Sequence, residues 1–593
     1  MKTCIFFVLS LLIQYGSASV CYGEFKPPKP TYVTVQTSRG SVTGVHMDFG
    51  SDKSQMYYGS GDVFRGIPYL TPPVGDLRWK KPMKLGNFTT SPWNATFDRP
   101  ACPQYGRSDI DEDCLYLNIY TPDATSKYKY PVMLWIHGGS LQTGSIRNYE
   151  PQGIIRNFVS RGVVVVTIQY RLGMLGFFTT FTNDFPANRG MLDQVEAIKF
   201  VKEEILNFGG NPYQITLFGE SAGSASVAAH TFSPLSQNLF QQAIMESGSV
   251  LTCFDGTIGF QNISVQRAET LCNYTKDDWN TMNYTRLWNC LANMDYSQFL
   301  DLDRALILGW NMVQDNYFMP DVPRNLAAKR PNIPVIYGNC RDEWALYELG
   351  FIANGVLQFS DYTKQSFELF FQLMASYLAS REVDIQTILE NVYLTMGASD
   401  DDNLAWFKMQ NDAFTSIGFT GLITKEINWY LANGNSKVYT YELTYASDIN
   451  RNTIIPGFKP VYHSEDILFV FMQEHLWKPA FQNGKVTKND YFVSDFFADT
   501  WTNFAKYSQP TLDDSWMATN SVMNYMDINP NPIVKNNYRL VDHYLWDKVV
   551  PPLIGNWPPE RPYYGNGTNA FEFDWSRTEY LISKLFPQYS VLF

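Results

Sequence analysis

Residues 216–227 read TLFGESAGSASV and contain a Gly-x-Ser-x-Gly pattern at positions 219–223. Residues 214–218 (QITLF) form a short apolar run, as expected of a strand buried on both faces. Small residues follow Ser221 and open a helix. A serine at such a sharp strand-to-helix turn has a positive φ, and a Cβ on either flanking glycine would collide across the turn. The segment therefore predicts a nucleophile elbow, whereas the pentapeptide alone is a weak motif.

Two other apolar runs of strand length lie upstream, at residues 131–136 (PVMLWI) and 163–169 (VVVVTIQ). Between the second run and the elbow, residues 191–208 place apolar side chains at helical spacing and end at a Gly-Gly-Asn-Pro stop signal. Strands that alternate with helices predict an α/β protein with a mostly parallel sheet covered by helices.

The second half of the chain continues this sheet. Residues 333–337 (IPVIY) and 437–445 (KVYTYELTY) are predicted strands, and residues 359–432 are predicted to form a helical insertion over the sheet. Neither an internal repeat nor a low-complexity linker divides the sequence. We therefore expect a signal peptide at residues 1–19, followed by a single domain over residues 20–593.

The N-terminus indicates the compartment. MKTCIFFVLSLLIQYGSASV combines Lys2, an apolar run and a small-residue cleavage region, which is typical of a secretory signal peptide. No later apolar run is long enough to span a bilayer, and the C-terminus has neither an ER-retention signal nor a lipid-anchor signal. We expect a secreted glycoprotein, with N-glycosylation sequons at Asn87, Asn94, Asn262, Asn273, Asn283 and Asn566.

Charge and cysteine content exclude several classes of partner. The net charge of −12, without a basic run, argues against nucleic acid and anionic membranes. Removing the signal peptide leaves seven cysteines, and the pairs closest in sequence are Cys102 with Cys114 and Cys272 with Cys290. Since no cysteine has Cys-x-x-Cys or histidine-cluster spacing, no metal site or other cofactor is expected.

A serine nucleophile needs a histidine base and an acid, in the chain order serine, acid, histidine. His463 lies in the loop after the last strong strand, where the base should come from. The other five histidines precede the serine, lie on the elbow helix, or lie in helix-like or late surface segments: His46, His137, His230, His475 and His543. The acid should follow the strand IPVIY, and position alone does not choose between Asp342 and Glu343.

The remaining requirement is a set of N–H donors for the oxyanion. The segment WIHGGSLQTGS closes the strand at residues 131–136 and carries Gly138, Gly139 and Ser140, whose amides could face the oxyanion. The N–H of Ala222 would complete the hole. Without the elbow, this segment would be interpreted as an ordinary glycine turn.

Together these residues resemble one family, the type-B carboxylesterases and cholinesterases. The similarity runs over nearly the whole mature chain and rests on FRGIPYLTPPVGDLRW, EDCLYLNIYTP, HGGS, VVVVTIQYRLGMLGFF, GGNP to GESAG, GNCRDEW and HSEDILFVF. It implies an α/β-hydrolase fold with the triad Ser221, Glu343 and His463. It also implies an oxyanion hole from Gly139, Ser140 and Ala222, and the disulfides Cys102–Cys114 and Cys272–Cys290.

Three positions depart from the family pattern. Ser140 stands where the family usually has a third glycine, and Trp344 where it usually has glycine after the triad acid, so both side chains are candidates for narrowing the site. The loop between Cys102 and Cys114 is short and lacks the tryptophan that cholinesterases use for choline. A choline ester is therefore not the expected substrate.

Two hypotheses follow. The first is a secreted serine carboxylic ester hydrolase that cleaves a small-molecule or lipid-like ester through an acyl-enzyme. The second is a cholinesterase-like extracellular binding or adhesion protein, because adhesion relatives keep this fold and some carry an HGGS loop. The filled triad positions and the absence of a visible membrane anchor favour the enzyme. Neither the natural substrate nor the oligomeric state follows from the sequence.

Overall fold

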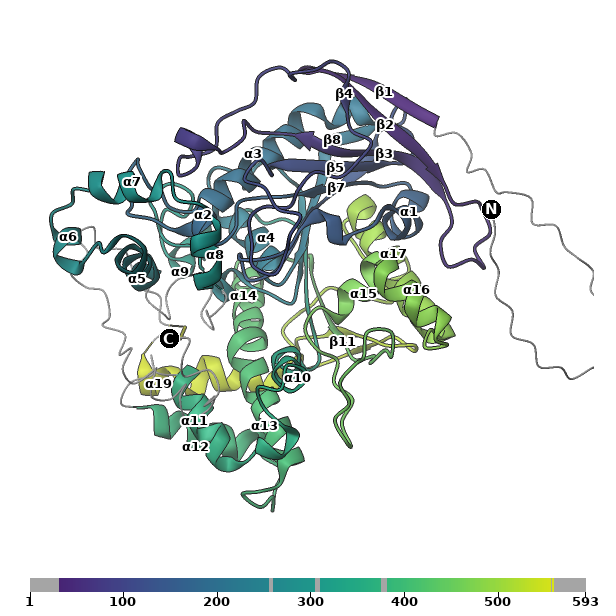
Figure 1. Ribbon diagram of the computed structural model, residues 1–593. Helices are drawn as coiled ribbons and strands as arrows, with labels where there is room; N and C mark the ends of the chain where they lie inside the picture. Colours follow the sequence, from purple (N-terminus) through teal and green to yellow (C-terminus); the bar gives the residue numbers. More distant parts are fainter. Residues whose placement is uncertain (1–30, 255–259, 304–309, 375–380, 556, 559–593) are drawn as a thin grey trace, which may run out of the picture.

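The computed structural model describes residues 31–254, 260–303, 310–374, 381–555 and 557–558. The expected signal peptide, Cys21 and the Asn566 sequon lie outside these residues. Figure 1 shows one large twisted sheet with helices on both faces and a further group of helices beyond its C-terminal strands.

The described strands form one sheet of thirteen strands in the order β1-β2-β3-β5-β7-β6-β8-β9-β10-β11-β12-β13, and β4 pairs with β2. Pairing is parallel from β7 to β12 and antiparallel through β1, β2, β3, β5 and β7, as well as between β12 and β13. This topology confirms the expected α/β-hydrolase class. The strand bounds are β1 Thr31–Thr37, β2 Gly40–Asp48, β3 Ser60–Pro68, β4 Trp93–Asn94, β5 Tyr116–Thr121, β6 Tyr130–Ile136, β7 Val164–Ile168, β8 Gly210–Glu220, β9 Gln242–Glu246, β10 Val335–Cys340, β11 Val438–Leu443, β12 Tyr525–Ile528 and β13 Ile533–Lys535.

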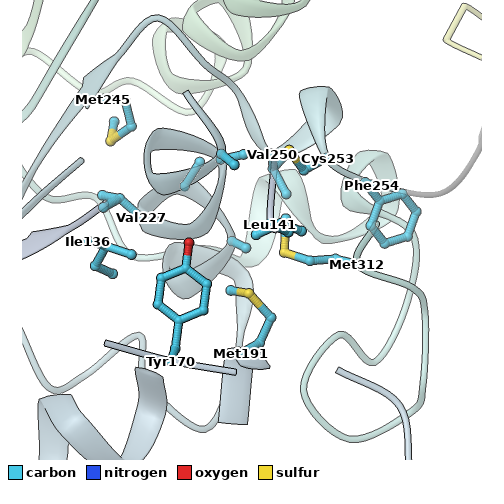
Figure 2. Packing of buried hydrophobic residues seen from close by; sticks show 14 of the residues in the cluster. Ile136, Leu141, Tyr170, Met191, Val227, Met245, Val250, Cys253, Phe254 and Met312 are labelled. Carbon is cyan, nitrogen blue, oxygen red and sulfur yellow. The ribbon is translucent and has the colours of Figure 1, made fainter. Parts of the chain in front are cut away.

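Helices cover both faces because the central strands are apolar on both sides. Along β6, Val132, Leu134 and Ile136 point into one buried cluster, whereas Met133 and Trp135 point into the other. The first cluster packs against α3 and α4, and the second against α1, α15 and α17. Figure 2 shows part of the first cluster, including Ile136 of β6, Met191 of α3 and Val227 of α4.

The helices reproduce the predicted pattern of strand–helix alternation and insertion. Bounds for the first half are α1 Pro151–Asn157, α2 Gly173–Phe177, α3 Arg189–Glu204, α4 Ala222–Phe232, α5 Phe260–Cys272, α6 Lys276–Asn280, α7 Thr285–Leu291, α8 Ser297–Asp303 and α9 Pro323–Leu326. Those for the second half are α10 Ala345–Ala353, α11 Lys364–Met374, α12 Glu382–Tyr393, α13 Asn403–Thr415, α14 Gly421–Ala432, α15 Glu465–Phe471, α16 Glu474–Gln482, α17 Lys488–Tyr507, α18 Leu540–Tyr544 and α19 Pro551–Ile554. The predicted insertion at residues 359–432 comprises α11 to α14, with a π-helical turn at Ser416–Thr420 between the last two.

Two predicted strands shift more than the others. The strand expected at 214–218 begins earlier, at Gly210, because Tyr130 at the start of β6 also pairs with the chain there. The strand expected at 333–337 begins at Val335 and continues to Cys340, which brings the following acidic pair closer to the sheet.

The predicted covalent features within the described residues are disulfides and glycosylation sequons. Both predicted disulfides are present, Cys102–Cys114 and Cys272–Cys290, and Cys253 and Cys340 are buried thiols. The sequon asparagines at positions 87, 94, 273 and 283 are exposed, while the side chain of Asn262 is not described. Among the described residues, no helix is long and apolar enough to cross a membrane, and no group of side chains is suited to hold a metal ion.

Candidate active site

Ser221 connects the end of β8 to the start of α4 with φ 57° and ψ −124°, a strained conformation for a residue with a side chain. Its N–H donates to Glu246 O over 2.8 Å. A Cβ added to Gly223 would lie 2.0 Å from Ile136 O, and one added to Gly219 would lie 2.7 Å from Gly223 O. The turn is therefore as closely packed as the sequence predicted, and only glycine fits at both flanking positions.

His463 lies between β11 and α15, and it is only 3% exposed. Its Nδ1 is 2.6 Å from Glu343 Oε2, and its backbone N–H donates to Glu343 O over 3.2 Å. The other carboxylate oxygen of Glu343 accepts from the Cys340 N–H over 2.6 Å. Glu343 is therefore fixed at both oxygens, and it orients the imidazole from the Nδ1 side.

The neighbouring acid has a different contact. Asp342 Oδ2 accepts from the Val461 N–H over 2.8 Å, and Asp342 N–H donates to Val461 O over 2.8 Å. Arg341 Nε also donates to this carboxylate, over 2.9 Å. Asp342 thus holds the loop that carries His463, whereas Glu343 contacts the ring itself.

The glycine-rich loop after β6 passes close to the elbow. A Cβ on Gly138 would lie 2.9 Å from Ser221 Cβ. Within the described residues, no hydrogen bond engages the backbone N–H of Gly139 or Ser140, and that of Ala222 is the first of α4. Three unpaired donors at this place can bind an oxyanion.

Ring stacking and side-chain hydrogen bonds fix the glycine-rich loop. The His137 ring stacks on Tyr170 at 4.6 Å, and burial lowers the pKa of His137 to about 4, so this imidazole is neutral. Gln104 accepts from the N–H of Gly144 and donates to its carbonyl, both over 2.8 Å. Ser140 has φ 56°, is exposed, and lines a cavity of about 250 Å³ together with Gly139.

Apolar side chains complete the surroundings. Leu141 belongs to the buried cluster of Val250, Cys253 and Met312, which Figure 2 draws next to it. The Phe419 ring lies 4.8 Å from the His463 ring and projects from the π-helical turn, a feature that often marks functional sites.

Sequence reasoning missed Glu220, the residue before Ser221. Glu220 is 2% exposed, and its Oε1 lies 3.2 Å from His463 Nε2. The same Oε1 accepts from the Ser464 hydroxyl over 2.5 Å. His463 Nε2 is nevertheless buried without a hydrogen-bond partner among the described residues. Glu220 Oε1 therefore lies close to Nε2 but outside the direction of a hydrogen bond. Glu220 is visible in the sequence as the glutamate of Gly-Glu-Ser-Ala-Gly. The sequence does not show on which face of the sheet its side chain lies, because the residue ends a strand.

Comparison of the sequence with known proteins identifies a family. The sequence model of the Carboxylesterase family matches residues 31–546. The chain belongs to the carboxylesterase family. It is 29% identical to carboxylesterase 1C of Mus musculus, over 89% of this chain and 94% of the relative. It is 29% identical to a medium-chain fatty acyl-CoA hydrolase precursor of Anas platyrhynchos (85% and 89%) and 28% identical to cocaine esterase of Oryctolagus cuniculus (87% and 96%).

One departure of this carboxylesterase is explained by its packing. The Trp344 indole donates to Glu348 Oε1 over 2.6 Å, and its ring lies 5.0 Å from that of Phe414. Glu348 also accepts from Tyr362 and Gln410. The indole is therefore fixed against the helical insertion, through Phe414 and through Glu348.

The histidines set aside in the sequence have structural contacts in the carboxylesterase fold. His230 is fully buried on α4 and bonds to Ser236 and Gln194. His475 pairs with Glu150 near the surface, and His543 approaches Asn428 from α18. His46 pairs with Asp62 on the β2–β3 ribbon.

The charges around His463 shift its proton affinity. Burial alone would lower the pKa of His463, but Glu220 and Glu343 outweigh burial and raise the pKa to about 9. Burial raises the pKa of Glu220, and it raises that of Asp466 on α15 to about 7. The imidazole thus carries a positive charge beside several buried carboxyl groups.

Proposed function

We propose that this member of the carboxylesterase family is a secreted serine carboxylic ester hydrolase that uses Ser221, His463 and Glu343 through an acyl-enzyme. The observation that carries the proposal is the buried imidazole, held at Nδ1 by Glu343 over 2.6 Å, whose Nε2 has no hydrogen-bond partner among the described residues. Such a nitrogen is available to take a proton from a serine hydroxyl.

The reaction follows from these positions. Ser221 Oγ attacks the ester carbonyl carbon while its proton moves to His463 Nε2. The carbonyl oxygen becomes an oxyanion, which the N–H groups of Gly139, Ser140 and Ala222 bind. The C–O bond then breaks, and His463 gives its proton to the departing alcohol.

The second half of the reaction regenerates the enzyme. Water attacks the acyl carbon, transfers a proton to His463 Nε2, and the carboxylic acid leaves as Ser221 recovers its proton. Throughout, Glu343 stabilises the imidazolium from the Nδ1 side. Because the base must be neutral in the free enzyme, kcat/KM is expected to rise with pH, with its acidic limb above histidine's ordinary value of 6.5.

The direct test is hydrolysis of p-nitrophenyl esters of increasing acyl-chain length, because relatives are named for substrates as different as fatty acyl-CoA and cocaine. Ser221→Ala should abolish turnover. Ser226→Ala is the matched control on the same helix, since its hydroxyl donates to Ala222 O and accepts from Gln194 Nε2, and it should stay active. Wild-type protein that neither hydrolyses any ester nor is labelled at Ser221 by an organophosphate would favour the binding-protein hypothesis instead.

The secretory part of the proposal rests on residues 1–19, the exposed sequon asparagines and the two disulfides. Expression in a eukaryotic secretory host should yield medium-borne protein that begins near residue 20 and shrinks on glycosidase treatment. Protein retained in the cytosol with an intact N-terminus would contradict it.

A further inference from the structure

Ser464, the residue after His463, has a backbone conformation that favours glycine. Its φ is 69° and its ψ 9°, at the N-terminal end of α15. A residue with a Cβ is strained in this left-handed region, whereas glycine is not. The side chain must therefore make an interaction that offsets the strain, or the position would be better filled by glycine.

The interaction of Ser464 is with Glu220. Its hydroxyl donates to Glu220 Oε1 over 2.5 Å, and this is the only side-chain hydrogen bond of the Glu220 carboxylate within the described residues. The same oxygen is 3.2 Å from His463 Nε2, yet the two atoms do not form a hydrogen bond. The Ser464 hydroxyl thus binds Glu220 Oε1, the oxygen that would otherwise turn toward the His463 ring.

On the other side, Glu220 has little room to move. A Cβ on Gly138 would lie 2.7 Å from Glu220 Oε2, so the oxyanion loop packs directly against the second carboxylate oxygen. The carboxylate is thus confined between Gly138 and Ser464, beside the ring.

We propose that Ser464 is a positioning residue whose hydroxyl holds the Glu220 carboxylate out of line with His463 Nε2 and so leaves that nitrogen to Ser221. The proposal rests on the proposed hydrolase function. Without the hydroxyl, Glu220 Oε1 is free to pair in line with the protonated imidazole, which stabilises the inactive form of the base and competes with the nucleophile.

Other titratable groups act on the same two side chains. Those that interact electrostatically with His463 or Glu220 are the neutral phenols Tyr149 after β6, Tyr170 after β7 and Tyr347 on α10, and the acids Glu246 on β9, Glu343 after β10 and Asp466 on α15. The hydrogen bond of Ser464 reaches none of them. Its effect on the pH profile must therefore pass through Glu220.

The test is the pH profile of kcat/KM for a neutral p-nitrophenyl ester, from pH 5 to 10. Ser464→Gly and Ser464→Ala should each move the acidic limb up by about one pH unit and lower kcat/KM at neutral pH by about tenfold. Ser508→Gly is the matched control, because Ser508 is another serine at positive φ (62°), located at the end of α17. It should leave the profile in place.

A double-variant cycle tests whether the effect of Ser464 on the pH profile depends on Glu220. Glu220→Gln removes the competing charge, so adding Ser464→Gly to that variant should shift the limb no further. Ser464→Gly should melt no lower than wild type, because glycine relieves the strain, and this excludes misfolding as the cause. The proposal would be overturned if the acidic limb of Ser464→Gly coincided with that of the wild type. It would also be overturned if Ser464→Gly still shifted the limb in the Glu220→Gln background. Inactive wild-type protein would instead refute the hydrolase function.

Discussion

Glu343→Gln tests which acid orients the base, and its effect follows from one backbone group. Glu343 Oε1 accepts from the Cys340 N–H over 2.6 Å. In the glutamine variant the amide oxygen must take this place, because an amide NH₂ there would face another donor. The NH₂ group then faces His463 Nδ1, which in the wild type lies 2.6 Å from a carboxylate oxygen.

The imidazole has to accept this hydrogen bond at Nδ1, so its proton moves to Nε2, and the ring can no longer take a proton from Ser221. The wrong tautomer in a serine triad lowers kcat by about 10⁴-fold. We expect a loss of this size at neutral pH, in a protein whose circular dichroism is unchanged because glutamate and glutamine have the same shape.

Asp342→Asn is the matched control. Its side-chain oxygen can still accept from the Val461 N–H, which is bound over 2.8 Å in the wild type, and the residue does not touch the ring. We expect kcat to fall less than about tenfold. Burst kinetics with a p-nitrophenyl ester would separate acylation from product release. A loss below tenfold in Glu343→Gln, or an equal loss in Asp342→Asn, would refute the assignment.

Three other predictions concern the elbow, the oxyanion loop and the pH dependence of stability. Gly223→Ala should lower the free energy of unfolding by more than about 3 kcal/mol, because the new Cβ would lie 2.0 Å from Ile136 O; an unchanged denaturant midpoint would contradict this. Ser140→Gly should raise the free energy of unfolding by about 1 kcal/mol, because its φ of 56° suits glycine. Activity should persist, since the donor is a backbone N–H, and a 10²-fold loss would argue for a side-chain role. Finally, the folded-state pKa of His463 is raised to about 9 and that of Glu465, chiefly by burial, to about 8. The folded state therefore holds these protons more tightly than the unfolded chain. The stability they contribute is lost as pH rises from 6.5 to 9 for His463 and from 4.5 to 8 for Glu465, so both losses occur together between pH 6.5 and 8. Melting temperatures should fall across this window, and a rise would contradict the linkage.

The central strands were predictable because their sequences are continuous apolar runs. In β7 every residue of Val164–Ile168 is buried, and the same holds for the part of β8 that leads into the elbow. The antiparallel β1 was not predicted, because most of TYVTVQT is exposed or half-buried, and its polar residues do not distinguish an edge strand from a loop. A strand is therefore predictable from a single sequence when it is buried on both faces.

The candidate site was predictable where the chain order constrains it. Ser221 and His463 could be chosen because a motif and elimination left few alternatives. Asp342 and Glu343 could not be separated, since both hold the histidine segment and differ only in which atom they contact. The contact of Glu220 with Ser464 joins residues 244 positions apart, and no local pattern encodes it.

The buried carboxyl groups also limit what any single substitution can reveal. Among the ion pairs of the described residues, Glu220 and Glu343 pair only with His463, and neither Glu246 nor Asp466 has a cationic partner. One imidazolium cannot neutralise four ionised carboxylates in a dry interior, so some must stay protonated, as the raised pKa of Glu246, due mainly to burial, indicates. Protons are therefore shared, and the acidic limb reports a macroscopic pKa of the cluster. A shift seen on changing one carboxylate does not identify the base, whereas a shift that disappears when its partner is also changed identifies the interaction.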